Sequence, residues 1–399
     1  MYKSLQITSA KAEPALLDLP WHLPLEEWPD SVTTALPRGI SRHVVRFVEL
    51  DRKFLAVKEI GETVAHHEYQ LLRDLNRLEA PCVQPLAVIT GRFSEDGEPL
   101  NAALVTRRLE FSLPYRAIFG QTIRQETVDR LINALTVLLV RLHLLGFFWG
   151  DVSLSNTLFR RDAGEFSAYL VDAETGELHQ NLSPNKRAYD IDVARTNIIG
   201  ELMDLQAGGI LDEEFDSVAV GDQLAERYHN LWAELTSEES FELSERWRVD
   251  ARIRRLNELG FEVGELSMRT DAGGTSLSIA PKVVDAGHYS RKVMRLTGLD
   301  VEEKQGRRIM NDIESYRAIS GQSGSPLSIV AHEWMTNIFE PTIRAIPPEY
   351  QHQLPPAQMF HEILEHRWFI SEQAGFDVPM HDAVQSYIYN VLRHRPTAQ

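Results

Sequence analysis

The stretch from Leu142 to Leu158 constrains the fold most, because it follows a long segment with apolar residues at helical spacing and then places two polar side chains five residues apart. These side chains are Asp151 and Asn156. Phosphoryl transfer needs a carboxylate that accepts the proton of the acceptor hydroxyl, and an amide oxygen that holds Mg²⁺ against the phosphates. Asp151 and Asn156 supply both groups at a suitable spacing.

Three further residues also suit phosphoryl transfer, and their order along the chain suits it as well. Asp172 ends an apolar strand sixteen residues after Asn156, where a second metal-binding carboxylate is needed. Upstream, Lys58 ends the expected strand 53–58, and Glu68 lies ten residues later on an expected helix. A lysine at such a place holds ATP phosphates, and a paired glutamate fixes the lysine side chain.

With these residues in this order, the segment 39–205 resembles the protein-kinase-like superfamily, in particular its lipopolysaccharide-kinase-like and aminoglycoside-phosphotransferase-like members. The resemblance implies an ATP-binding domain with Lys58 as the phosphate-binding lysine and Glu68 as its partner. It implies Asp151 as the catalytic base, and Asn156 and Asp172 as the Mg²⁺ ligands. It also implies that Asp192 braces the catalytic loop from beneath.

The segment departs from the pattern of its relatives at the phosphate loop. Only Gly39 stands there in place of a run of three glycines, so phosphate contact is expected from Ser41 and Arg42. Eighteen residues separate Asp172 from Asp190, which is too few for a long regulatory activation loop. The poor glycine content motivates an alternative hypothesis, a catalytically silent kinase-like binding or scaffold protein, that is, a pseudokinase.

Four segments are expected along the chain. They are an N-terminal arm at 1–38 that packs along a domain surface, a kinase-like N-lobe at 39–110, a C-lobe at 111–240 and a C-terminal α+β domain at 241–399. The expected fold class is α+β: a two-lobed protein-kinase-like fold, followed by a mostly helical extension that contains a β-hairpin around a turn at 271–274. The extension resembles an uncharacterised domain often attached to lipopolysaccharide-kinase-like domains, and that resemblance names no chemistry.

The charge and the cysteine content limit the cellular compartment and the classes of partner that we expect. The chain has 41 Lys and Arg against 58 Asp and Glu, a net charge of −17, which disfavours polyanionic partners. Basic residues nevertheless gather in the C-terminal part, as at Arg291, Lys292 and Arg295, and nucleic acid is the less favoured partner there. Cys82 is the single cysteine, and no apolar run reaches the roughly 18 residues of a membrane span. A cytoplasmic protein without a membrane span is expected.

The sequence therefore predicts an ATP- and Mg²⁺-dependent phosphotransferase with an acceptor that the residues do not name. In this hypothesis the C-terminal domain selects the acceptor or a protein partner. In the alternative, the kinase-like domain is silent and the C-terminal domain recruits protein or nucleic acid.

Overall fold

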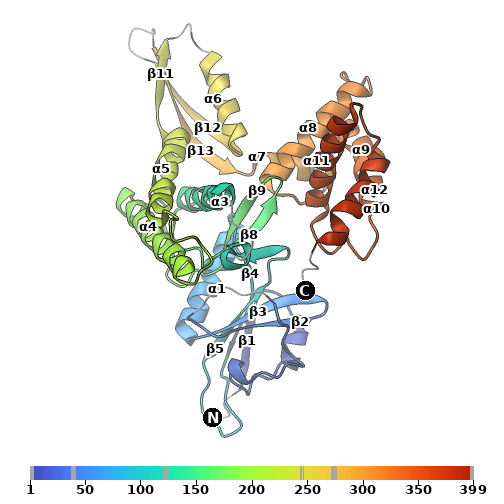
Figure 1. Ribbon diagram of the computed structural model, residues 1–399. Coiled ribbons are helices and arrows are strands. Elements are labelled where there is room, and N and C mark those ends of the chain that lie inside the picture. Colours follow the sequence, from blue (N-terminus) through green and yellow to red (C-terminus); the bar gives the residue numbers. More distant parts are fainter. Residues whose placement is uncertain are drawn as a thin grey trace. The chain divides into compact units, whose positions relative to one another are not determined.

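The structure is a computed structural model that describes residues 4–36, 42–119, 125–242, 245, 247–270 and 276–395 (Figure 1). The chain divides into two compact units. Unit 1 comprises Met1–Arg160 and Ala168–Leu231, and unit 2 comprises Arg161–Ser167 and Trp232–Gln399. The second unit therefore includes a short segment that lies in the middle of the first one along the sequence.

Unit 1 begins with an antiparallel sheet whose strands run in the order β1-β4-β5-β3-β2. The expected strand that ends in Lys58 and the expected helix with Glu68 are present in the series β2 (Val45–Leu50), β3 (Lys53–Ile60), α1 (Glu62–Arg77), β4 (Gln84–Thr90) and β5 (Ala102–Arg107). β2 and β3 form a hairpin whose two turn residues, Asp51 and Arg52, have φ values of 50° and 62°. A two-residue turn with positive φ matches the twist of the flanking strands.

The N-terminal arm is part of the core of this lobe. Its strand β1 (Gln6–Ser9) pairs antiparallel with β4, and 3₁₀ turns follow at Pro14–Asp18 and Leu25–Glu27. Trp21 and Trp28, each 4% exposed, pack edge to face at 5.2 Å between ring centroids. The buried guanidinium of Arg92 donates to the carbonyl oxygens of Trp21 and Leu23 at 3.2 and 2.6 Å. The arm thus fills one face of the sheet.

The rest of unit 1 is mainly helical. Its elements are β6 (Ser112–Pro114), α2 (Tyr115–Phe119), α3 (Gln125–Leu144), β7 (Phe147–Phe148), β8 (Thr157–Asp162), β9 (Glu165–Leu170), β10 (Glu177–Leu178), α4 (Pro184–Ala207) and α5 (Ser217–Thr236). Of these, β8, β9 and α5 each extend into unit 2. Gly146 follows α3 with φ of 84°, and a Cβ there would collide with the carbonyl oxygen of His179. Only glycine fits this turn, which leads the chain into the loop that carries Asp151 and Asn156.

Unit 2 contains the sheet β11-β13-β12 and a group of helices. Its elements are β11 (Glu239–Glu242), α6 (Trp247–Glu258), β12 (Phe261–Thr270), β13 (Ser276–Ala286), α7 (His288–Thr297), α8 (Glu303–Ile319), α9 (Leu327–Trp334), a π-helical turn (Met335–Phe339), α10 (Glu340–Arg344), α11 (Pro356–Ala374) and α12 (Met380–Asn390). Trp334, Phe339 and Phe360 are at the centre of one apolar cluster. The expected hairpin is present, while its turn at 271–274 lies outside the described residues.

The α+β class expected from the sequence is confirmed, with strands concentrated in the N-terminal lobe and helices in the C-terminal part. Within the described ranges, no helix combines the length and the apolar character that crossing a membrane requires.

Candidate active site

Lys58 on β3 lies among three carboxylates. Its ammonium nitrogen is 2.7 Å from Asp172 Oδ2, 3.0 Å from Glu68 Oε2 and 3.7 Å from Glu174 Oε2. Glu68 comes from the buried face of α1, and its other oxygen accepts the backbone N–H of Ala173 at 3.3 Å. The structure therefore brings together the lysine, the helix glutamate and the second carboxylate that the sequence singled out.

Burial sets the charge balance around Lys58. Burial opposes the charge on the lysine, but the carboxylates of Glu68 and Asp172 outweigh it and raise the pKa of Lys58 above its ordinary value. Burial also raises the pKa of Glu68 to about 7, while the Lys58 ammonium acts in the opposite direction. Lys58 is accordingly a cation at neutral pH, and Glu68 changes its charge close to that pH.

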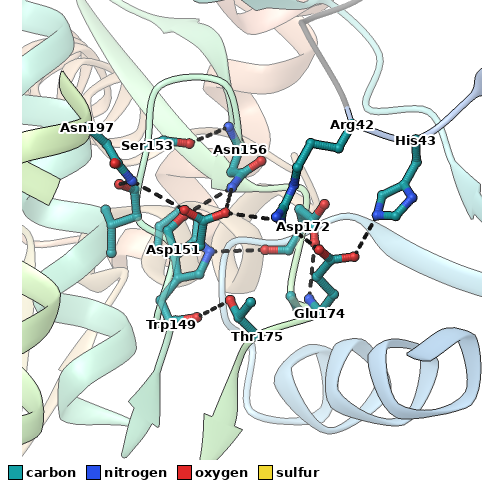
Figure 2. Close-up of polar contacts among 12 residues, drawn as sticks. Arg42, His43, Trp149, Asp151, Ser153, Asn156, Asp172, Glu174, Thr175 and Asn197 are labelled. Carbon is teal, nitrogen blue, oxygen red and sulfur yellow. Dashed lines mark hydrogen bonds and ion pairs between the residues drawn. The ribbon is translucent and has the colours of Figure 1, made fainter. Parts of the chain in front are cut away.

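Asp151 and Asn156 form the expected pair on the loop between β7 and β8 (Figure 2). The amide nitrogen of Asn156 donates to the backbone oxygen of Asp151 at 3.0 Å and to its Oδ2 at 3.2 Å. Asn197 on α4 donates its amide N–H to Asp151 Oδ1 at 3.2 Å. Two amides thus orient the carboxylate of Asp151, and a metal ion would be held by the remaining amide oxygen of Asn156.

Asp190 supports this loop by accepting hydrogen bonds from its backbone. Its Oδ2 accepts the backbone N–H of Trp149 at 2.8 Å, and its Oδ1 accepts that of Gly150 at 2.7 Å. His143 Nε2 lies 3.1 Å from Asp190 Oδ2, and both side chains are fully buried. Asp192, to which the sequence assigned this role, is exposed to solvent. The reason is the helical period of α4, which turns Asp190 inward and the residue two positions later outward.

Glu174 contacts Lys58 and also the segment of Arg42 and His43. Its Oε1 accepts from Arg42 Nη2 at 2.7 Å, and its Oε2 lies 2.9 Å from His43 Nε2 (Figure 2). Arg42 also lies 3.5 Å from Asp151 Oδ2. Arg42 therefore reaches the site, as the sequence predicted for a phosphate contact, whereas Ser41 lies outside the described residues.

An acidic cluster that could hold a metal ion lies beside a cavity. One oxygen from each of Glu68, Asp172 and Glu174 lies within 4.8 Å of the others, and such hard oxygen atoms suit Mg²⁺. A cavity of about 650 Å³ adjoins them. Its wall includes Lys58, Asn156 and Asp172 at one place, and the segment Thr106–Leu109 at the end of β5 at another.

Two polar residues at the site, Asn197 and Glu201 on α4, were not predicted. Glu201 accepts the backbone N–H groups of Leu154 and Ser155, both at 2.8 Å. Asn197 and Glu201 share one face of α4 with Asp190, because the spacings of seven and eleven residues correspond to two and three helical turns. This polar stripe is a signal in the sequence that could have identified all three residues.

Fold and site together define a protein-kinase-like domain. Residues 43–196 match the model of the lipopolysaccharide kinase (Kdo/WaaP) family, and residues 230–392 match a domain of unknown function, DUF4032. Residues 43–196 therefore form a lipopolysaccharide-kinase-like domain, and an uncharacterised domain follows them in the chain. Both matches confirm the resemblance seen in the sequence.

A comparison with solved structures gives a weaker likeness. A structure described as WaaP in complex with acyl carrier protein aligns with 56% of this chain and 99% of its own, at 16% identity and a TM-score of 0.35. The search of curated proteins found no match.

The basic residues of unit 2 are partly engaged in structure. Arg252 is buried and donates to the carbonyl oxygen of Ser237 at 2.6 Å. Arg255 pairs with Glu234 and Glu239, and Arg291 lies 3.4 Å from Glu262. These contacts lend no support to a nucleic-acid surface, and that hypothesis stays a prediction.

Proposed function

We propose that the kinase-like domain binds ATP and Mg²⁺ and transfers a phosphoryl group to a hydroxyl-bearing acceptor. The observation that carries the proposal is the position of Lys58, which is paired with Glu68 and Asp172 at the wall of a cavity large enough for a nucleotide. In the lipopolysaccharide-kinase-like pattern this pairing places a cation where phosphates bind.

The remaining residues support distinct roles in this reaction. The cavity wall at Thr106–Leu109 would receive the adenine, and Lys58 and Arg42 would bind phosphate oxygens. Asn156 and Asp172 would hold Mg²⁺, which when bound neutralises charge on the phosphates. Asp151, oriented by Asn156 and Asn197, would accept the proton of the acceptor hydroxyl.

The ion pairs described above have a consequence for binding. Lys58 and Arg42 contact Asp172, Glu174 and Asp151 directly, so a nucleotide must draw these cations from carboxylates to phosphates. Mg²⁺ supplies replacement positive charge to the carboxylates. Nucleotide binding is therefore expected to depend strongly on Mg²⁺.

Calorimetric titration with a non-hydrolysable ATP analogue, with and without Mg²⁺, tests the proposal. The wild-type protein should bind the analogue only with Mg²⁺, and Lys58→Ala and Asp172→Asn should each weaken binding by at least about tenfold. Lys53→Ala is the matched control, because Lys53 lies on the same strand but does not line the cavity. Absence of binding to folded wild-type protein would contradict the proposal and favour the silent scaffold.

A further inference from the structure

The hairpin of β8 and β9 carries both proposed Mg²⁺ ligands at its open end. Asn156 directly precedes β8, and Asp172 follows β9 by two residues. The backbone oxygen of Asn156 accepts the N–H of Val171 at 3.1 Å, so the two ends of the hairpin are bonded to each other. The geometry of the ligand pair therefore depends on the position of this hairpin.

The tip of the same hairpin belongs to unit 2, which includes Arg161–Ser167. Within unit 2, Asp162 is 2% exposed and accepts three hydrogen bonds. Its Oδ1 accepts from the backbone N–H of Gln305 at 2.8 Å, and its Oδ2 accepts from that of Lys304 at 3.0 Å and from the Ser167 hydroxyl at 3.0 Å. A buried carboxylate is thus fully engaged at the tip.

Two buried glutamine side chains form hydrogen bonds with the backbone of the hairpin tip. Gln305 on α8 donates its Nε2–H to the carbonyl oxygen of Arg161 at 3.0 Å. Gln358 on α11 accepts the N–H of Ala163 at 3.0 Å and also accepts from Gln305 Nε2 at 3.1 Å. Each glutamine is 2% exposed, and buried amides are retained where such bonds satisfy them.

The bonds from Asp162 also complete helix α8. Lys304 and Gln305 lie in its first turn, where backbone N–H groups have no partner inside the helix. Asp162 supplies acceptors for those N–H groups from 142 and 143 residues away in the sequence. Loss of these bonds would therefore affect α8 and the hairpin tip together.

We propose that Asp162 is a positioning residue through which unit 2 fixes the hairpin that carries Asn156 and Asp172, so that the DUF4032 part of the chain sets the Mg²⁺ affinity of the kinase-like site. The proposal rests on the proposed function for the roles of those two ligands. It gives unit 2 a role within the catalytic machinery in addition to any role in selecting a partner.

Asp162→Asn tests the proposal, because it keeps the shape of the side chain but places an amide N–H against one of the helix N–H groups. Glu303→Gln is the matched control. Glu303 accepts the backbone N–H groups of Tyr289 and Ser290 at 2.8 and 3.0 Å at the start of α7, so it makes the same kind of contact within unit 2. Unlike Asp162, it contributes no bond to the hairpin tip through its side chain.

Two measurements on the full chain are needed. Hydrogen exchange at the Val171 amide reports on the open end of the hairpin without any ligand. Titration of Mg²⁺ at a fixed concentration of the ATP analogue reports on the metal site. Asp162→Asn should speed exchange at Val171 and weaken Mg²⁺ binding, each by about tenfold.

The control should leave both quantities as in the wild type even where it destabilises unit 2 to the same extent. If Asp162→Asn behaves like Glu303→Gln in both measurements, the proposal is wrong. If the wild-type protein binds no Mg²⁺–nucleotide, the proposed function fails, and a Val171 exchange rate unaffected by Asp162→Asn would overturn the positioning role as well. Faster exchange in that case would support the structural link alone.

Discussion

Replacement of Asp190 by asparagine is the sharpest test of how the catalytic loop is supported. Asp190 accepts hydrogen bonds from the backbone N–H groups of Trp149 and Gly150 and contacts His143, and the side chains of Asp190 and His143 are fully buried. Burial lowers the pKa of His143, with Asp190 acting against it, so the ring stays neutral and donates its Nε2–H. In Asp190→Asn, one acceptor oxygen becomes an N–H donor that faces another donor.

The size of the effect follows from those contacts. A hydrogen bond to a charged group contributes about 1.5–3 kcal/mol, and a buried donor left without a partner costs about 1–3 kcal/mol. Because at least one backbone N–H loses its acceptor, we expect the free energy of unfolding to fall by about 3 kcal/mol. Displacement of the Asp151 loop by about 1 Å would also lower turnover by about a hundredfold.

Urea unfolding followed by circular dichroism measures the stability change. Asp192→Asn is the control, because it makes the same chemical change at an exposed position two residues away, and it should change stability by no more than about 0.5 kcal/mol. If the two substitutions lower the free energy of unfolding equally, or if Asp190→Asn lowers it by less than about 1 kcal/mol, Asp190 does not support the loop as described.

Two further predictions concern the lysine site and the arm. Because burial raises the pKa of Glu68 from 4.5 to about 7, the folded state binds more protons than the unfolded state between these values, and Glu68 makes the free energy of unfolding decrease as pH rises through that window. Urea unfolding at a series of pH values should show this slope in the wild type and a shallower one in Glu68→Gln; identical slopes would contradict the prediction. Trp21→Ala should lower the free energy of unfolding by about 4 kcal/mol, because Trp21 is buried and donates to the Leu16 carbonyl at 2.6 Å. Leu17→Ala, at a 65% exposed side chain of the same segment, is its control, and a similar loss in both would show that the arm is not part of the core.

The sequence predicted the kinase-like fold because its evidence is local and ordered. Lys58, Glu68, Asp151, Asn156 and Asp172 each occupy a characteristic place relative to a strand or helix, so their order along the chain was informative. The structure brings them to one region of unit 1, as expected. Their catalytic roles stay predictions.

Features that depend on partners distant in the sequence were not predicted. The arm was expected to pack along a domain surface, but the surface that it covers depends on contacts such as that between Trp21 and Arg92, 71 residues later. Helix α7 (His288–Thr297) was missed because its register is set by packing and by the capping Glu303. The choice of Asp192 over Asp190 was avoidable, since the buried positions of α4 follow a helical period that includes only Asp190.

The link between the hairpin tip and α11 has a consequence for synthesis of the chain on the ribosome. The N–H of Ala163 bonds to Gln358, which lies 195 residues further along the sequence. At typical translation rates, Gln358 is made on the order of 10–40 s after Ala163. The kinase-like lobes therefore leave the ribosome with the tip of the β8–β9 hairpin unfixed, and the final geometry of that hairpin forms only when nearly the whole chain has been translated.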